Sequence, residues 1–171
     1  GYDRGHLVPA ADMAFSEEAM SETFYMSNVA PQVRAFNMGI WRELEELTRD
    51  WAKKFRHLYV VSGPVLTERP IDWIGDNEVA VPARFYKVLL DLSEPEYKAI
   101  AWIIPNEESD KPLTEYATTV DEVERLTGID FFPELMDEAL EAELEGHFDN
   151  DLWRLNPKKY DLRVKKWNNF R

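Results

Sequence analysis

Four consecutive residues near the start of the chain, Asp3, Arg4, Gly5 and His6, combine groups that could act on a phosphate ester. A neutral imidazole accepts a proton from water near pH 7, and a guanidinium binds phosphate through paired hydrogen bonds. A carboxylate beside them can orient either group. The same residues also fit a polar loop in which Asp3 bridges to Arg4 or His6. The motif alone therefore leaves two interpretations open, a catalytic base at His6 and an ordinary loop histidine.

Asn37, Glu45 and Arg49 form a second group, and their spacing places them along one edge of a helix. Glu45 follows Asn37 by eight residues, a little over two turns, and Arg49 follows Glu45 by four. The amide oxygen of Asn37 is a suitable ligand for a hard cation. Asn37 fits equally well as a helix N-cap, however, and Glu45 with Arg49 fits an ordinary surface pair. Both interpretations stay open at this point.

The elements that must position these residues follow from hydrophobic periodicity. From Phe36 to Phe55 apolar residues recur every three or four positions, which predicts an amphipathic helix. We expect an extended segment over 23–29 with a turn at Pro31. Further strands are predicted at 58–62, 78–81, 84–92 and 97–104, and helices at 16–20, 120–126 and 133–145. The expected fold class is α+β, a central, mainly antiparallel sheet flanked by helices.

Composition indicates a folded chain whose charge is unevenly distributed. The 171 residues are 44% hydrophobic, include no cysteine and carry a net charge of −13. Residues 107–151 contain 16 acids and two bases, whereas residues 152–171 contain seven bases and one acid. These basic residues could hold a phosphate backbone, although a solvated terminus explains the pattern as well. The bases are Arg154, Lys158, Lys159, Arg163, Lys165, Lys166 and Arg171.

Two blocks of this sequence resemble the DNA/RNA non-specific endonuclease family, which includes mitochondrial endonuclease G and the sugar-non-specific nucleases. The first block is Tyr2–Asp12, and the second runs from Thr23 to Gln32 and continues from Phe36 to Glu45. A weaker third similarity covers Val120–Pro133. The resemblance implies a ββα-metal core, also called a His-Me finger. In such a core a strand and loop present the base, a second strand follows, and a helix presents the metal ligand.

The same resemblance assigns roles to individual residues. It implies that His6 is the general base that activates water, that Asn37 is the direct protein ligand of a hydrated Mg²⁺, and that Arg4 contacts the phosphate. Glu45 would hold metal-bound waters, and Mn²⁺ or another divalent cation is an alternative to Mg²⁺. The implied substrates are DNA and RNA, with little sequence specificity because phosphate contacts do not read bases. The remaining supporting residues are Asp3, Asn28 and Arg49.

Two other functions fit the same residues. One is a non-catalytic nucleic-acid or protein-binding module on an inherited nuclease core, and the other is a metal-independent phosphodiesterase acting on small nucleotides.

We expect residues 1–171 to form a single nuclease domain that lacks the N-terminal strands usual in the family. No apolar run approaches the roughly 18 residues of a membrane span, so no membrane partner is expected. The sequence is compatible with a homodimer without showing one. A secreted or periplasmic bacterial protein is expected, with any export signal absent from this chain.

Overall fold

A four-stranded antiparallel sheet forms the centre of the computed structural model, which describes residues 1–169. The strand order is β3-β6-β7-β8, and Arg84 lies opposite Pro105 while Asp91 lies opposite Lys98. The antiparallel pair predicted on either side of residues 93–96 is therefore confirmed. The strands are β3 (Tyr59–Pro64), β6 (Arg84–Asp91), β7 (Lys98–Pro105) and β8 (Ala117–Thr118).

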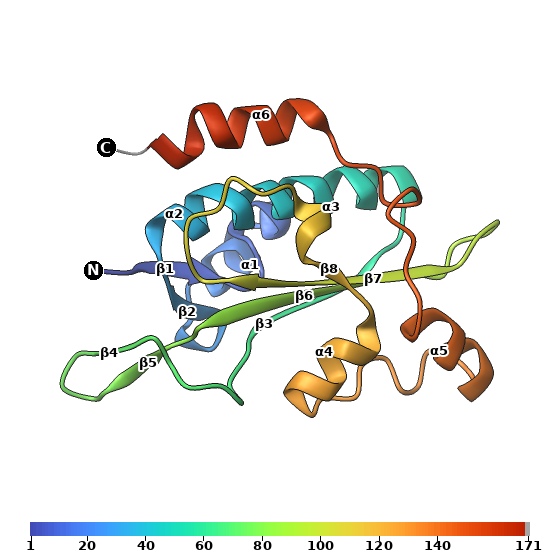
Figure 1. Ribbon diagram of the computed structural model, residues 1–171, viewed down its shortest axis with the longest axis horizontal. Coiled ribbons are helices and arrows are strands. Elements are labelled where there is room, and N and C mark those ends of the chain that lie inside the picture. Colours follow the sequence, from blue (N-terminus) through green and yellow to red (C-terminus); the bar gives the residue numbers. More distant parts are fainter. Residues whose placement is uncertain (170–171) are drawn as a thin grey trace.

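Helices cover both faces of this sheet (Figure 1). On one face lie α3 (Arg42–Phe55) and, outside it, α6 (Pro157–Lys165), and on the other lie α4 (Val120–Thr127) and α5 (Glu138–Glu145). Alternation along β6 explains the division, because Phe85 and Leu89 join the core beneath α3 while Tyr86, Val88 and Leu90 join the core beneath α4 and α5. The α+β architecture predicted from the sequence is confirmed.

A β-β-α unit stands beside the central sheet. Strand β1 (Asp3–His6) pairs antiparallel with β2 (Val29–Gln32), with His6 opposite Val29. Gly5 is required in β1, because a Cβ there would overlap the side chain of Gln32. The helix that follows begins with α2 (Arg34–Phe36), widens into a π-helical segment (Asn37–Trp41) and continues as α3. Its backbone bends at Gly39, where φ is −102° and ψ is −108°.

Three local predictions were wrong in position. Residues 23–28 are not extended, because α1 (Glu17–Glu22) leads into a 3-10 turn (Met26–Asn28) and the strand begins only at Val29. The predicted turn at Pro31 is part of β2, where proline is tolerated because its missing N–H faces away from the single partner strand β1. Helix α5 begins at Glu138 because the side chain of Asp137 caps it, accepting hydrogen bonds from the N–H groups of residues 139 and 140.

The basic C-terminal segment is a packed helix, and the interpretation as a solvated terminus is wrong for its best-buried bases. Arg163 is fully buried and forms an ion pair with Glu43 of α3. Its guanidinium also donates hydrogen bonds to the carbonyls of Ser109 and Lys111. Lys159 lies 3.1 Å from a carboxylate oxygen of Glu46. Lys158, Lys165 and Lys166 remain exposed, and Arg171 lies outside the described residues.

The remaining elements are small. A hairpin of β4 (Asp72–Ile74) and β5 (Val79–Val81) projects from one end of the molecule (Figure 1). Short 3-10 turns occur at Ala10–Met13, Leu113–Tyr116 and Trp167–Asn169. Within residues 1–169, none of the helices combines the length and apolar character needed to cross a membrane.

Candidate active site

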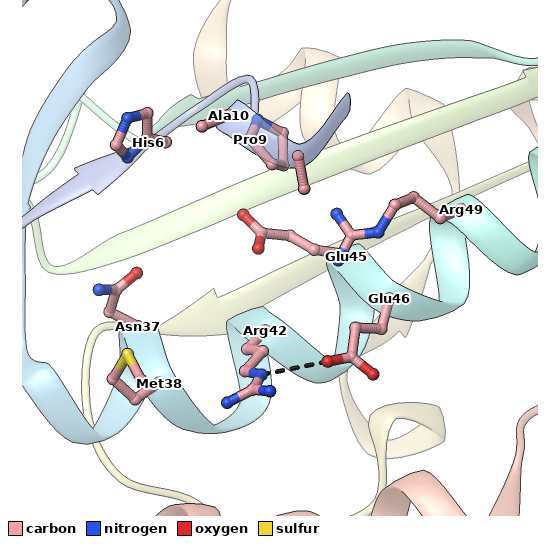
Figure 2. A pocket seen from close by; sticks show the side chains of 10 residues that line it. His6, Pro9, Ala10, Asn37, Met38, Arg42, Glu45, Glu46 and Arg49 are labelled. Atoms are coloured by element: carbon pink, nitrogen blue, oxygen red, sulfur yellow. Dashed lines mark hydrogen bonds and ion pairs between the residues drawn. The ribbon is translucent and has the colours of Figure 1, made fainter. Parts of the chain in front are cut away.

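Four of the seven predicted site residues meet at one cavity. His6 comes from β1, Asn37 from the start of the bent helix, and Glu45 and Arg49 from α3. The cavity has a volume of about 360 Å³. Figure 2 shows the carboxylate of Glu45 pointing toward the side where His6 and Asn37 lie. The β-β-α unit therefore brings together residues that are up to 43 positions apart in the sequence. The other lining residues are Pro9, Ala10, Ala11, Met38, Arg42 and Glu46.

His6 is held in a partly apolar environment. Its ring packs edge-on against Phe24, with 4.6 Å between ring centroids. Nε2 is buried without a hydrogen-bond partner among the described residues, which leaves Nδ1 as the more accessible nitrogen. Burial lowers the pKa of His6 below its ordinary value, because the charged imidazolium loses solvation. The imidazole is therefore neutral, and able to accept a proton, at neutral pH.

Asp3 fixes the orientation of the Asn37 amide. The Nδ2 group of Asn37 donates a hydrogen bond of 3.0 Å to one carboxylate oxygen of Asp3, and Arg34 lies 3.3 Å from the other. With its nitrogen held by Asp3, Asn37 turns its oxygen toward the cavity (Figure 2). Asn37 is not the N-cap of the helix, because the helix begins at Arg34 and Val33 occupies that position. The alternative in which Asp3 bridges to Arg4 or His6 is likewise wrong, since its carboxylate binds Arg34 and Asn37.

Glu45 is an acid whose surroundings contain both signs of charge. Burial raises the pKa of Glu45 to about 7, and the positive charges of Lys87 and Arg49 oppose that shift. Arg49 is itself paired with Asp12 at 2.8 Å, so Glu45 and Arg49 do not form the simple surface pair that their spacing allowed. A cation that bound to Glu45 would favour its charged form further.

Lys87 is a residue of this region that the sequence analysis missed. It is almost completely buried on β6, where its Nζ donates a hydrogen bond of 2.6 Å to Ser62 and lies 4.8 Å from the ring centroid of Trp41. Burial lowers the pKa of Lys87 to about 8, and the charge of Glu45 opposes that shift. The sequence did contain a signal, because position 87 shares its strand face with Phe85 and Leu89, which pack beneath α3.

Asn28 supports the loop that follows His6. Its side-chain oxygen accepts a hydrogen bond from the N–H of Val8, and its Nδ2 donates to the carbonyls of Val8 and Thr23, all at 2.9 Å. The backbone carbonyl of Asn28 also accepts a hydrogen bond from the N–H of Leu7. Asn28 therefore contacts backbone and lies outside the cavity lining, in a position that fixes the exit of β1.

Arg4 is a second predicted site residue that lies away from the cavity, and among the described residues it forms no hydrogen bond or ion pair with the lining side chains. Its side chain is exposed and lines a different hollow, together with Met26, Ile74 and Val79 near the β4–β5 hairpin. The alternation of β1 places Arg4 and His6 on the same face of the ribbon, two residues apart. Arg4 can therefore reach a long ligand that lies across the ribbon, but it does not line the His6 cavity.

Three acidic residues that sequence reasoning did not single out gather elsewhere. Oxygen atoms of Asp121, Glu124 and Glu145 lie within 4.8 Å of one another, on α4 and α5. These helices cover the face of the sheet opposite α3, so the cluster is distinct from the cavity at Asn37. It is not the metal position that the sequence predicted.

Comparison with known proteins identifies the class of this fold. A solved chain described as the crystal structure of the EndoG/EndoGI complex superposes with a TM-score of 0.72 at 35% sequence identity, covering 80% of this chain and 61% of that one. The β-β-α unit and its antiparallel sheet are thus those of the ββα-metal nucleases. The family model described as DNA/RNA non-specific endonuclease matches residues 1–138. The chain belongs to the DNA/RNA non-specific endonuclease family.

Named relatives agree with this membership. The zebrafish (Danio rerio) protein "Nuclease EXOG, mitochondrial" is 39% identical over 154 residues, covering 82% of this chain and 45% of the relative. Human "Endonuclease G, mitochondrial" is 36% identical over 151 residues, covering 81% and 51% respectively. The yeast "Mitochondrial nuclease" is 36% identical over 150 residues, covering 76% and 46%. The chain spans about half the length of these relatives.

These relatives correct the expected localisation. We expected a secreted or periplasmic bacterial protein, but the zebrafish, human and yeast relatives are all named as mitochondrial nucleases. The expectation was wrong, because neither the composition nor the catalytic motif carries information about compartment.

Proposed function

We propose that this chain is a Mg²⁺-dependent endonuclease that hydrolyses phosphodiester bonds in DNA and RNA with little sequence specificity. One observation carries the proposal: a neutral imidazole, an oriented amide oxygen and a half-buried carboxylate converge on a single cavity from β1 and the bent helix. Membership of the endonuclease family and the names of its relatives support the same activity. We further propose that residues 1–171 act as one nuclease domain.

The residues present fit a hydrated divalent cation. Asp3 leaves the Asn37 oxygen facing the cavity, and the Glu45 carboxylate points the same way without a hydrogen-bonded side-chain partner among residues 1–169. Mg²⁺ keeps several of its waters and needs few protein ligands, so Asn37 would hold it directly and Glu45 through water. When bound, the ion would stabilise the negative charge that develops on the phosphate oxygens during cleavage.

The protein's own groups account for the remaining steps. His6 accepts the proton of an attacking water, and its lowered pKa keeps the imidazole in the accepting form at neutral pH. The buried position of Nε2 makes Nδ1 the accepting atom. Asp3 orients Asn37, Asn28 fixes the loop after His6, and Arg49 helps to keep Glu45 ionised. Arg4 binds a phosphate that lies beyond the cavity, along the β1–β2 ribbon. None of these proposed contacts involves a base edge, so little sequence specificity is expected.

The test is cleavage of supercoiled plasmid and of RNA, in Mg²⁺ and in chelator, followed on gels. The unmodified chain should nick both substrates in Mg²⁺ and neither in chelator. Asn37→Ala should abolish Mg²⁺-supported cleavage and weaken Mg²⁺ binding measured by calorimetry, because it removes the direct ligand. Asn150→Ala, an exposed asparagine far along the chain, is the matched control and should behave as the parent.

Each alternative outcome has a distinct meaning. Binding of plasmid without cleavage in any cation would indicate a non-catalytic binding module and would overturn the proposal. Equal cleavage in chelator would indicate a metal-independent phosphodiesterase. Unchanged Mg²⁺ affinity in Asn37→Ala would remove that residue from the metal site.

A further inference from the structure

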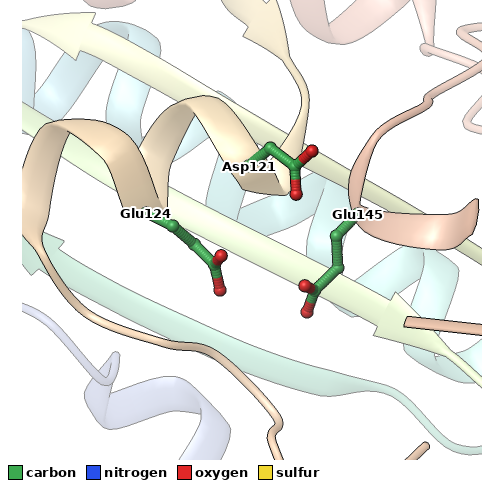
Figure 3. Close-up of side chains that lie close together, drawn as sticks. All are labelled: Asp121, Glu124 and Glu145. Atoms are coloured by element: carbon green, nitrogen blue, oxygen red, sulfur yellow. The ribbon is translucent and has the colours of Figure 1, made fainter. Parts of the chain in front are cut away.

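We propose that Asp121, Glu124 and Glu145 form a calcium site that ties α4 to α5, on the face of the sheet opposite the nuclease cavity. The three side chains come from two helices that meet at this point, two from α4 and one from the last turn of α5 (Figure 3). The proposal does not depend on the proposed nuclease activity.

Glu145 provides the observation that points to a ligand. Its side chain is almost entirely buried, with only 3% of the residue exposed, and it points into the cluster. One of its oxygens, Oε1, is buried without a hydrogen-bond partner among the described residues. A buried, unpaired carboxylate oxygen is costly unless a proton or a cation satisfies it.

The charges around Glu145 increase this cost. The groups that act on it are all acidic, namely Glu124, Glu141, Asp121 and Asp130. Burial, with these neighbouring charges, raises the pKa of Glu145 to about 8. A cation bound between the carboxylates would offset the repulsion between their negative charges.

The arrangement of the oxygens suits calcium. The three ligand atoms lie within 4.8 Å of one another. Ca²⁺ accepts about six to eight oxygen ligands in a flexible geometry, whereas Mg²⁺ demands a near-ideal octahedron. Three carboxylates from two helices therefore suit the more tolerant geometry of calcium.

The surroundings suit a partly hydrated ion. Glu124 is held in place because its Oε1 accepts a hydrogen bond of 2.7 Å from the N–H of Phe131. Asp121 is exposed, so water can complete the coordination from that side. Glu145 would bind the ion from the buried side. Exposed and buried carboxylates together provide three negative charges for one divalent cation.

The experiment measures the melting temperature of the full chain in CaCl₂ and in chelator, with calorimetry for affinity. At a Ca²⁺ concentration of about one hundred times Kd, the parent should melt about 5–10 °C higher than in chelator. Glu145→Gln should weaken Ca²⁺ binding at least tenfold and lose most of this increase. In chelator, the same variant should be at least as stable as the parent, because the neutral amide needs neither the proton nor the cation that the buried carboxylate needs.

Three further variants test whether the ion binds at this cluster. Glu143→Gln makes the same charge change at an exposed position of α5 and should keep the full Ca²⁺ response. Asn37→Ala should also keep it, and a response lost there would place the ion in the nuclease cavity and overturn the proposal. Asp121→Asn, at an exposed position, should reproduce the loss even if Glu145→Gln folds poorly. A parent whose melting temperature does not change with Ca²⁺ would contradict the proposal and indicate a protonated Glu145.

Discussion

The two faces of the central sheet bury carboxylates in different ways. Beneath α3 and α6, Glu43 is paired with Arg163, and Glu45 lies near Lys87 and Arg49. Beneath α4 and α5, the charges around Glu145 are all acidic. Both faces therefore carry the cost of desolvating an acid, but only the α3 face offsets it with the protein's own bases. The difference indicates that the second face depends on a proton or a cation from solution.

The largest expected effect is on stability, and it comes from removing the base that pairs with the buried acid on the α3 face. Arg163→Met leaves Glu43 buried without its partner, which should lower the free energy of unfolding by about 3–5 kcal/mol, measured by denaturant melts. The double variant with Glu43→Gln removes both charges and should recover a large part of this loss. A single variant as stable as the parent would show that Glu43 accommodates burial as Glu145 does, and the contrast between the faces would disappear.

The second effect concerns catalysis, which only the α3 face should carry. His6→Ala should lower plasmid cleavage by at least about 10²-fold with unchanged folding, because the base is removed. The matched control is His147→Ala, an exposed histidine next to α5, which should keep parental activity. Near-full activity of His6→Ala would exclude His6 from the mechanism.

The pH profile of the parent tests the same assignment more finely. His6 must be neutral to accept a proton, so activity should rise with pH through the pKa of His6 and then level off. Because burial lowers that pKa, the midpoint should fall below the ordinary value of about 6.5. With Mg²⁺ saturating, so that the bound cation keeps Glu45 ionised, a midpoint above this value, or a flat profile from pH 5 to 8, would contradict the neutral-base role.

The smallest expected effect concerns the exposed bases of the C-terminal segment. Lys158, Lys165 and Lys166 changed together to Ser should flatten the salt dependence of DNA binding, by about 0.9 in log–log slope for each phosphate that is no longer neutralised. Lys159 should be left unchanged, because it is engaged with Glu46 and Asp50 of α3. Cleavage at saturating substrate should stay the same. A slope equal to that of the parent would confine the nucleic-acid surface to the region around Arg4, Arg34 and Arg49.

Local patterns predicted much of the fold. The 3–4 periodicity after Phe36 and the two strands flanking residues 93–96 are properties of adjacent residues, and the structure confirms both. The bend at Gly39 was not predicted, because the apolar pattern continues through it. The packing of α6 against α3 was not predicted either. A basic helix is expected to lie in solvent unless its acidic partners, here on α3, are known.

The candidate site was likewise predicted only in part. Family resemblance identified the motif residues, and their proposed roles stay predictions. The contacts that prepare the site were beyond sequence reasoning, because they join distant positions: Asp3 meets Asn37 across 34 residues, and Lys87 faces Glu45 across 42. The acidic cluster escaped notice for a similar reason. Glu145 is 24 residues from Asp121, and both lie in a stretch where acids are the commonest charged residue.

The contacts of Arg163 have a consequence for the order in which the molecule can form during synthesis. Translation delivers β1, β2 and the bent helix before α6, yet Glu43 on that helix gains its partner only when residue 163 has left the ribosome. The same side chain then secures the carbonyls of Ser109 and Lys111. Until that moment the nascent chain contains the motif but carries Glu43, an acid without its basic partner, in the first turn of α3. Completion of the α3 face is thereby delayed until α6 has been made.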